Sequence, residues 1–378
     1  MACEALALLD SFASLPDPRM QRTQLHKLID ILAIAILGAI CGADNWVDMA
    51  EFGRAKERWL RRFLELPNGI PSHDTFGRVF ARVDPEQFGL CFAAWVKTIG
   101  TLAKGQVIAL DGKTARRSHD RVAGREAIHM VSAWATANHL TLGQVKVGSK
   151  SNEITAIPKL LRTLDLAGCI VTIDAMGCQR DIAEQIIRQG GDYVLAVKEN
   201  QGGLLERIQG IFERAERTDY AYIEEHDDCQ TVGKGHGRIE IRRCWVISEP
   251  AQTLYAQSQA FWCGLRSLLK IESERHVGDQ VSRETRYYIT SLLCDARQGL
   301  YVVRSHWGVE NELHWSLDVT LGEDDSRVRK EHAPENLAIL RRLVLSLLKQ
   351  ERTVQRGLQG KRLLAGWNDA YLLKVLGV

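Results

Sequence analysis

Two aspartates of the sequence stand where a carboxylate is costly unless it is paired or bound to a cation. Asp111 directly follows the apolar run 107–110, and Asp174 directly follows the similar run 170–173. Each run is typical of a short buried strand, and open α/β sheets bind their ligands at strand ends. One such aspartate often only caps a turn. Two aspartates in the same context favour a shared functional site.

A third carboxylate would complete a site for a hard divalent cation such as Mg²⁺, for which Mn²⁺ is a possible substitute. Glu310 and Glu312 are the candidates, in the segment 304–319, which is rich in Trp and His and predicted to be helical. In an α-helix, His306 and His314 lie four residues from Glu310 and share its face. Glu312 points about 200° away from Glu310. Solvated glutamates fit the same pattern.

Basic residues near these acids could contact DNA phosphates. Lys113, Arg116 and Arg117 closely follow the first aspartate, and Lys198 follows the predicted strand 193–197. A solvated charged loop is an equally good interpretation of each residue taken singly.

The elements that would position these residues change along the chain. Residues 1–100 are predicted to be helical, with an apolar helix over 25–42, a helix with a basic face over 46–66, and helices starting near 76 and 85. Strands are predicted at 107–110, 128–137, 144–147, 170–173 and 193–197, with helices over 154–164 and 181–189. This pattern predicts a mixed α/β sheet covered by helices.

The second half is expected to be rich in strands and then helical again. Strands are predicted over 238–247, 265–277 and 281–292, the last two joined by a turn at Gly278 and Asp279. Helices follow residue 300. Between residues 327 and 362, ten Lys or Arg stand against three Glu. This basic tail and the helix bearing Arg61 and Arg62 are expected to bind DNA in a salt-sensitive way.

Composition is that of a globular protein of two or three structural units. The 378 residues carry a formal charge of +2, with 45% hydrophobic and 25% charged residues, which excludes collagen, coiled coils and wholesale disorder. The nine cysteines include no CxxC pair, so a zinc knuckle is not expected. The cysteines favour a location in a reducing cytoplasm. The longest apolar run, 31–41, is too short to span a membrane.

Several motifs together resemble one family. They are DPR…H.L.DILAIAILGAI, IALDGKTARRS, VTIDAMGCQ, YVLAVKENQ, HGRIEIRR and SHWGVENELHWSLDV, in this order over nearly the whole chain. The chain resembles insertion-sequence transposases of the ISAs type, which include the H-repeat-associated proteins. The resemblance implies a ribonuclease-H-like catalytic domain over 105–378, with a β-rich insertion at about 218–295 and a basic helical C-terminus. It implies a helical, DNA-binding domain over 1–100.

The resemblance also implies a DDE triad that holds Mg²⁺ and acts on DNA. Asp111, Asp174 and Glu310 fall on the family's acids, with Asp174 at 63 positions after Asp111 and Glu310 at 136 positions after Asp174. The implied partners are the terminal repeats of the element and the target DNA, bound by a homodimer. The motif HGRIEIRR adds His236 and Arg238 as DNA contacts or as a structural hairpin.

His306 is a further candidate DNA contact, because it occupies the place of an arginine that grips phosphate in related transposases. The neighbouring tyrosine and lysine places hold Val303 and Leu317. The main hypothesis is therefore a transposase that cuts and joins DNA. The alternatives are a metal-dependent nuclease without strand transfer and a DNA-binding relic without activity. If neither Glu310 nor Glu312 is needed, Asp318 is the next candidate acid.

Overall fold

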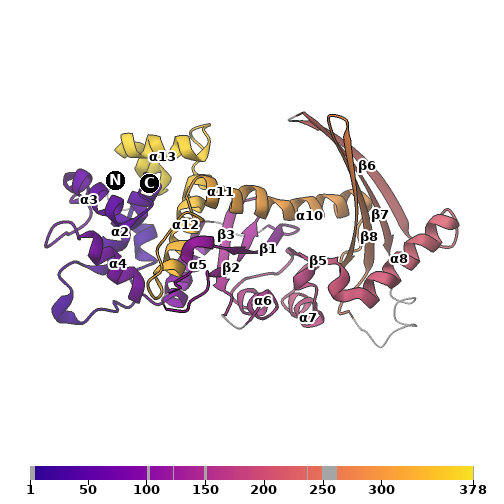
Figure 1. The fold of residues 1–378 in the computed structure, drawn as a ribbon, viewed down its shortest axis with the longest axis horizontal. Helices are drawn as coiled ribbons and strands as arrows, with labels where there is room; N and C mark the ends of the chain where they lie inside the picture. Colours follow the sequence, from indigo (N-terminus) through magenta and orange to yellow (C-terminus); the bar gives the residue numbers. More distant parts are fainter. Residues whose placement is uncertain are drawn as a thin grey trace. The chain divides into compact units, whose positions relative to one another are not determined.

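The chain adopts a mixed α/β fold built on nine strands (Figure 1). The computed structural model describes residues 5–99, 103–121, 123–148, 151–235, 237–248 and 262–377. The strands are β1 (Val107–Thr114), β2 (His129–Ala135), β3 (Leu140–Lys146), β4 (Ile170–Ile173), β5 (Asp192–Val197), β6 (His226–Gly235), β7 (Arg238–Ser248), β8 (Ser267–Val277) and β9 (Gln280–Thr290). They are hydrogen-bonded in the order β3-β2-β1-β4-β5-β9-β8-β7-β6.

The chain forms two compact units, and each consists of separate stretches of sequence. Unit 1 comprises Met1–Thr101, Gly112–Lys150 and Glu310–Val378, whereas unit 2 comprises Leu102–Asp111 and Ser151–Val309. These units differ from the expected division into domains 1–100 and 105–378. The reason lies within unit 1, where the C-terminal helices pack against the N-terminal ones and share a core with them.

Unit 1 is mainly helical. Its helices are α1 (Ala5–Asp10), η1 (Gln21–Thr23), α2 (Leu28–Ile40), α3 (Trp46–Leu60), α4 (His73–Arg82), α5 (Pro85–Ile99), η2 (Arg116–Ser118), α11 (Trp315–Val319), α12 (Ala333–Gln350), α13 (Leu358–Trp367) and α14 (Asp369–Val375). The apolar helix predicted near residue 25 is confirmed, because α2 is buried from Asp30 to Ile40. Helix α12 packs against α2, α4, α5 and β3 (Figure 1).

Two helix starts in unit 1 follow from capping side chains. The Ser72 hydroxyl accepts a hydrogen bond from the Thr75 amide, so α4 begins at His73, three residues before the predicted start. The Asn45 side chain accepts from the Asp48 amide at 3.0 Å and starts α3. The segment of α4 is therefore longer than its apolar residues alone indicate.

Unit 2 contains the parallel part of the sheet. Besides its strands, it has α6 (Glu153–Leu161), η3 (Ala175–Gly177), α7 (Arg180–Arg188), η4 (Glu199–Gln201), α8 (Gly202–Arg217) and α10 (Ala296–Gly308). Strand β4 pairs in parallel with both β1 and β5, whereas β9 is antiparallel to β5. The alternating helices and strands predicted from residue 154 onward are confirmed.

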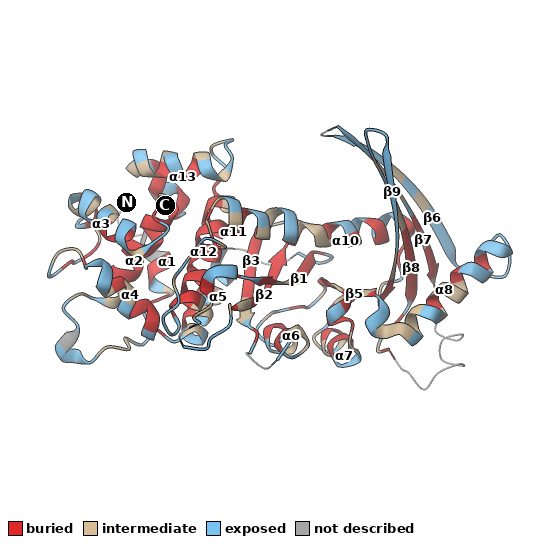
Figure 2. Cartoon of the chain, in the orientation of Figure 1, coloured by how far each residue is buried: buried red, intermediate tan, exposed pale blue. Residues whose placement is uncertain are grey.

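Strands β6 to β9 form a run of antiparallel hairpins within unit 2. Strands β8 and β9 are joined at Gly278 and Asp279, as predicted, and Gly278 has the positive φ of +57° that such a turn requires. Each of β7, β8 and β9 is buried at one end and exposed at the other (Figure 2). Strand β6 was not predicted as a separate strand, because it is exposed along nearly its whole length and its apolar residues do not alternate.

Four of the ten Lys and Arg residues of the expected basic tail are buried and five are exposed, and its binding to DNA stays a prediction. Arg341, Arg342, Lys361 and Arg362 are all buried in unit 1. Burial of a guanidinium requires hydrogen-bonding partners, and Arg362 finds them in the Ala39 carbonyl and the Asp44 carboxylate. Charge counted along the sequence therefore overstates the charge on the surface.

None of the helices that the structure describes is both long and apolar enough to cross a membrane.

Candidate active site

The two aspartates singled out by the sequence stand on neighbouring parallel strands of unit 2. The register pairs Leu110 of β1 with Ile173 of β4, and the next residue of each chain segment is Asp111 or Asp174. Residues paired in this way project to the same face of a sheet. The predicted placement on neighbouring strands is confirmed, although β1 continues beyond Asp111 to Thr114.

Asp174 is partly buried and is fixed by the loop that follows it. Its Oδ1 accepts a hydrogen bond from the Met176 amide at 3.1 Å, so it caps the short helix η3. Burial raises the pKa of Asp174, and the negative charge of Glu153 adds to this, against the Gly177 and Met176 amides and the charge of Lys198. A cation beside this carboxylate would relieve the cost of its charge.

The loop after β5 holds the loop after β4 in place. The Asn200 side chain donates to the Ala175 carbonyl at 2.6 Å, and the Gln201 side chain donates to the Cys178 carbonyl at 2.9 Å. These two residues lie in the motif YVLAVKENQ, but the sequence analysis assigned them no role. Their signal was the pair of amide side chains that closely follows a buried strand. Lys198 in the same loop is exposed.

Glu310 lies in a π-helical turn of unit 1. Residues Val309–His314 (η5) form i→i+5 hydrogen bonds, which makes the turn wider than that of an α-helix. The helix predicted over 304–319 is therefore not a continuous α-helix. Glu310 is exposed, and its side chain forms no hydrogen bond or ion pair with any residue that the structure describes.

Glu312 has a different environment from Glu310. Its carboxylate pairs with the His139 ring and lies 3.7 Å from the Lys349 ammonium. Burial raises the pKa of Glu312, but the hydrogen bonds and charges of His139 and Lys349 outweigh it and leave the pKa below its ordinary value. Glu312 is thus already neutralised within unit 1. A turn residue with a positive φ of +52°, His139, presents the ring.

His306 lies in α10 of unit 2, where its Nδ1 is 3.0 Å from the Thr172 hydroxyl. Burial lowers the pKa of His306 to about 4. The ring is therefore neutral at physiological pH and supplies no positive charge to a DNA phosphate.

Lys113, predicted as a DNA contact, is buried among carboxylates of unit 1. Its ammonium lies 2.7 Å from Asp318, 3.2 Å from Asp324 and 3.7 Å from Glu323. Glu323 also accepts from Arg342 at 2.8 Å. Lys113 is therefore held as part of an internal ion network. Asp318, the reserve candidate for the third acid, is held in the same network.

The remaining predicted DNA contacts are exposed or lie outside the described residues. Arg116 pairs with Asp324 at 3.2 Å, and Arg117 pairs with Asp325 at 3.1 Å. Arg238, at the start of β7, is 3.3 Å from Glu240. His236 lies outside the residues that the structure describes.

The donor chemistry of the aspartate pair fits a hard cation, because carboxylates are the ligands that Mg²⁺ prefers. The pair occupies one edge of unit 2. Over the described ranges, no group of three His, Cys, Asp or Glu side chains is gathered closely enough to hold a metal ion. The pair therefore offers two ligands that fit such a cation.

The family to which the chain belongs agrees with this arrangement. Residues 9–96 match the family described as DDE_Tnp_1-associated, and residues 102–347 match the family described as Transposase DDE domain. The sheet with two strand-end aspartates is thus that of a DNA transposase. The chain belongs to the DDE transposase family of insertion elements.

Relatives align with the chain over almost its full length. The "H repeat-associated putative transposase YhhI" of Escherichia coli strain K12 is 39% identical over 377 residues, which are 99% of this chain and 98% of that protein. The "Putative protein YbfL" of the same strain shows the same identity and coverage. An "Uncharacterized protein in dhlA 3'region" of Xanthobacter autotrophicus is 47% identical over 288 residues, 75% of this chain and 94% of that one.

Proposed function

We propose that the protein is an active, metal-dependent transposase that cleaves DNA at the ends of its element and transfers the freed strand into target DNA. The observation that carries this proposal is the pairing of β1 with β4, which sets Asp111 and Asp174 side by side. Two carboxylates that follow paired residues of neighbouring parallel strands offer the oxygen ligands that a hard cation prefers.

The fold proposed for this catalytic domain is ribonuclease-H-like. Its support is the strand order β3-β2-β1-β4-β5, in which the antiparallel pair β2 and β3 is followed by the parallel strands β1, β4 and β5. The acids then lie on the two central strands. Strands β6 to β9, over residues 226–290, correspond to the proposed β-rich insertion.

The proposed cofactor is Mg²⁺, with Mn²⁺ as a substitute. Asp111 and Asp174 would hold it together with Glu310, and when bound it would activate a water or hydroxyl and stabilise the leaving oxyanion. The chain's own contribution is to position these acids. Asn200 and Gln201 hold the loop that carries Asp174, and exposed Lys198 next to it offers a positive charge to a DNA phosphate.

Glu310 is the proposed third acid. Its support is its exposure and its lack of partners among the described residues, whereas Glu312 is paired with His139 and Lys349. Glu312 would have to give up both partners before it could bind a metal. Its expected role is to hold the π-helical turn to the rest of unit 1.

The proposed setting is bacterial cytoplasm, with a homodimer acting on DNA. Free thiols are found at every cysteine that the structure describes, which supports a reducing compartment. Two copies are proposed because two element ends must reach one target site.

The test compares Glu310→Gln with Glu312→Gln on a linear DNA that carries the element ends. Glutamine keeps the shape of the side chain and removes the charge that balances the cation. We expect Glu310→Gln to abolish Mg²⁺-dependent nicking and strand transfer while DNA binding stays near normal. Glu312→Gln should keep most of both activities and lower the thermal stability.

Other outcomes would separate the alternatives. Nicking without joined products would indicate a nuclease, and retention of DNA without any cleavage by the unchanged protein would indicate a relic. Reversed effects of the two substitutions would show that Glu312, and not Glu310, is the third acid.

A further inference from the structure

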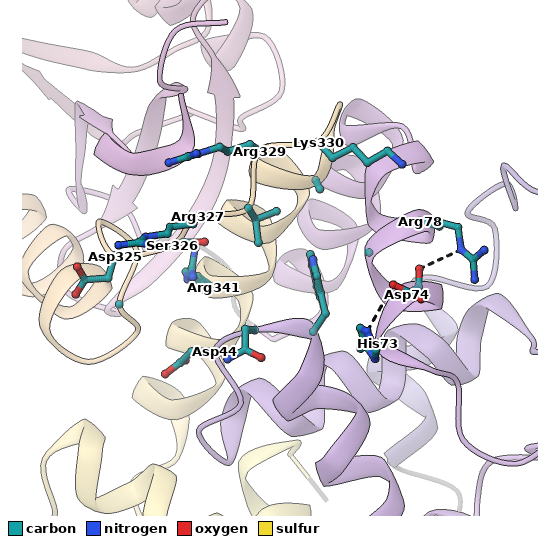
Figure 3. Close-up of a pocket in the computed structure, with 16 residues that line it drawn as sticks. Asp44, His73, Asp74, Arg78, Asp325, Ser326, Arg327, Arg329, Lys330 and Arg341 are labelled. Carbon is teal, nitrogen blue, oxygen red and sulfur yellow. Dashed lines mark hydrogen bonds and ion pairs between the residues drawn. The ribbon is translucent and has the colours of Figure 1, made fainter. Parts of the chain in front are cut away.

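A cavity of about 770 Å³ lies within unit 1 and is lined by positive side chains (Figure 3). One wall comes from the start of α3 and from α4, and the other comes from the segment 322–330 and from α12. The residues that line it do not include Asp111 or Asp174, which belong to unit 2. Its volume lies in the range of roughly 300–1,000 Å³ that is usual for ligand sites.

Arg341 is the buried cation of this cavity. It is 5% exposed and lines the wall, and its Nε donates to the Leu321 carbonyl at 3.1 Å. Within the part of the chain that the structure describes, its guanidinium forms no ion pair. Burial lowers the pKa of Arg341, although the charges of Glu323 and Asp44 act against the shift.

The neighbouring buried arginines show that this situation is particular to Arg341. Arg342 pairs with Glu323 at 2.8 Å, and Arg362 pairs with Asp44 at 2.6 Å. A buried charge without a counter-ion is strongly unfavourable. Arg341 therefore lacks a carboxylate within ion-pair distance, and the cavity that it lines offers space for an anion.

The mouth of the cavity adds further positive charge. Arg327 and Lys330 are exposed and form no ion pair with described residues, and both come from the segment 322–330 (Figure 3). Two of the three acids of the lining pair with arginines outside it, and the third, Asp74, lies 3.5 Å from His73. Asp325 is 3.1 Å from Arg117, and Asp44 is bound by the buried arginine of α13. The cavity therefore presents an uncompensated positive field to an anion.

We propose that this cavity binds a phosphate group of the DNA backbone, with Arg341 at its wall and Arg327 and Lys330 at its mouth. The inference rests on the proposed function, since it names a DNA-binding site outside the acids. Guanidinium groups bind phosphate oxygens through paired hydrogen bonds. A backbone is favoured over a free phosphate because three cations are spread over a cavity much larger than one phosphate.

The experiment measures the affinity of full-length protein for a duplex carrying the element ends, as a function of salt. The variants are Arg341→Gln, the pair Arg327→Gln with Lys330→Gln, and the control Arg352→Gln, which changes an exposed arginine outside the cavity. Each lost phosphate contact should flatten the slope of log affinity against log salt by about 0.9. Affinity at fixed salt should fall about tenfold for Arg341→Gln, and the control should match the unchanged protein.

A second arm uses duplexes in which single phosphates are replaced by neutral methylphosphonates. One position should weaken binding to the unchanged protein and have no effect on Arg341→Gln, which identifies the phosphate at this site. If Arg341→Gln does not fold, the double variant of Arg327 and Lys330 still tests whether the cavity binds DNA. A third arm measures the thermal stability of each protein with inorganic phosphate.

Equal slopes and affinities for all folded variants would overturn the inference. Stabilisation by inorganic phosphate that depends on Arg341, without any change in DNA affinity, would overturn the DNA source and assign the cavity to a free phosphate. Failure of the unchanged protein to bind or cleave DNA would instead refute the proposed function. Unchanged cleavage chemistry at saturating DNA in the cavity variants would leave the catalytic proposal intact.

Discussion

Replacing Arg342 by methionine should strongly destabilise unit 1, because this guanidinium is fully buried. Its Nη1 donates to Glu323 at 2.8 Å and to the Ala338 carbonyl at 3.1 Å, and its Nε donates to the Ser132 hydroxyl at 3.0 Å. The substitution leaves Glu323, which is 2% exposed, with only Lys113 at 3.7 Å. Breaking a buried ion pair costs about 3–5 kcal/mol.

Because Glu323 keeps its contact with Lys113, the loss of unfolding free energy should lie near the lower end of this range, at about 3 kcal/mol. Urea unfolding followed by circular dichroism measures it. Arg352→Met is the control, an exposed arginine whose replacement should change stability by less than about 0.5 kcal/mol. The double variant Arg342→Met with Glu323→Leu should be more stable than Arg342→Met alone, because no charge is left buried without its partner. Equal stabilities of Arg342→Met and Arg352→Met would refute the reasoning.

Two further predictions concern the loop that carries Asp174. Gly177→Ala should destabilise the protein by about 1–3 kcal/mol, because the new Cβ would lie 2.2 Å from Ile173 Cγ2; Gly89→Ala in α5 meets no neighbouring atom and should raise thermal stability. Asp174→Asn should stabilise the protein at pH 7, because the raised folded-state pKa means that the charged aspartate destabilises the fold. This gain in stability should shrink as the pH falls toward 3.8, because protonation removes the charge of the native aspartate. Thermal unfolding at several pH values, with exposed Asp165→Asn as control, tests it; a gain independent of pH would contradict it.

The sequence was sufficient to locate the aspartate pair and much of the sheet. The runs before Asp111 and Asp174 are apolar and short, and such runs form buried strands in many contexts, so local pattern and structure agree. The turn at Gly278 followed from a residue type that tolerates positive φ. Strand β6 could not be predicted in this way, because exposed polar strands are fixed by their pairing and not by their own composition.

The environment of single charged residues could not be predicted from the sequence. Arg342 and Lys113 read as surface cations because their acidic partners are distant along the chain, and only the fold brings Glu323 to both. The π-helical turn was not predicted either. Over six positions, the pattern of apolar residues does not distinguish a π-helix from an α-helix.

The ion network of unit 1 bears on the candidate active site through the chain itself. Lys113 follows Asp111 by two residues on the same strand, and three carboxylates fix its ammonium. A strand that is fixed at Lys113 has little freedom at the residues just before it. The ion network therefore restrains the backbone at Asp111. The same network engages Asp318. Among the three acids considered as the proposed third ligand, Asp318 pairs with Lys113 and Glu312 pairs with His139. Glu310 is exposed, which supports the proposal that it is the third acid.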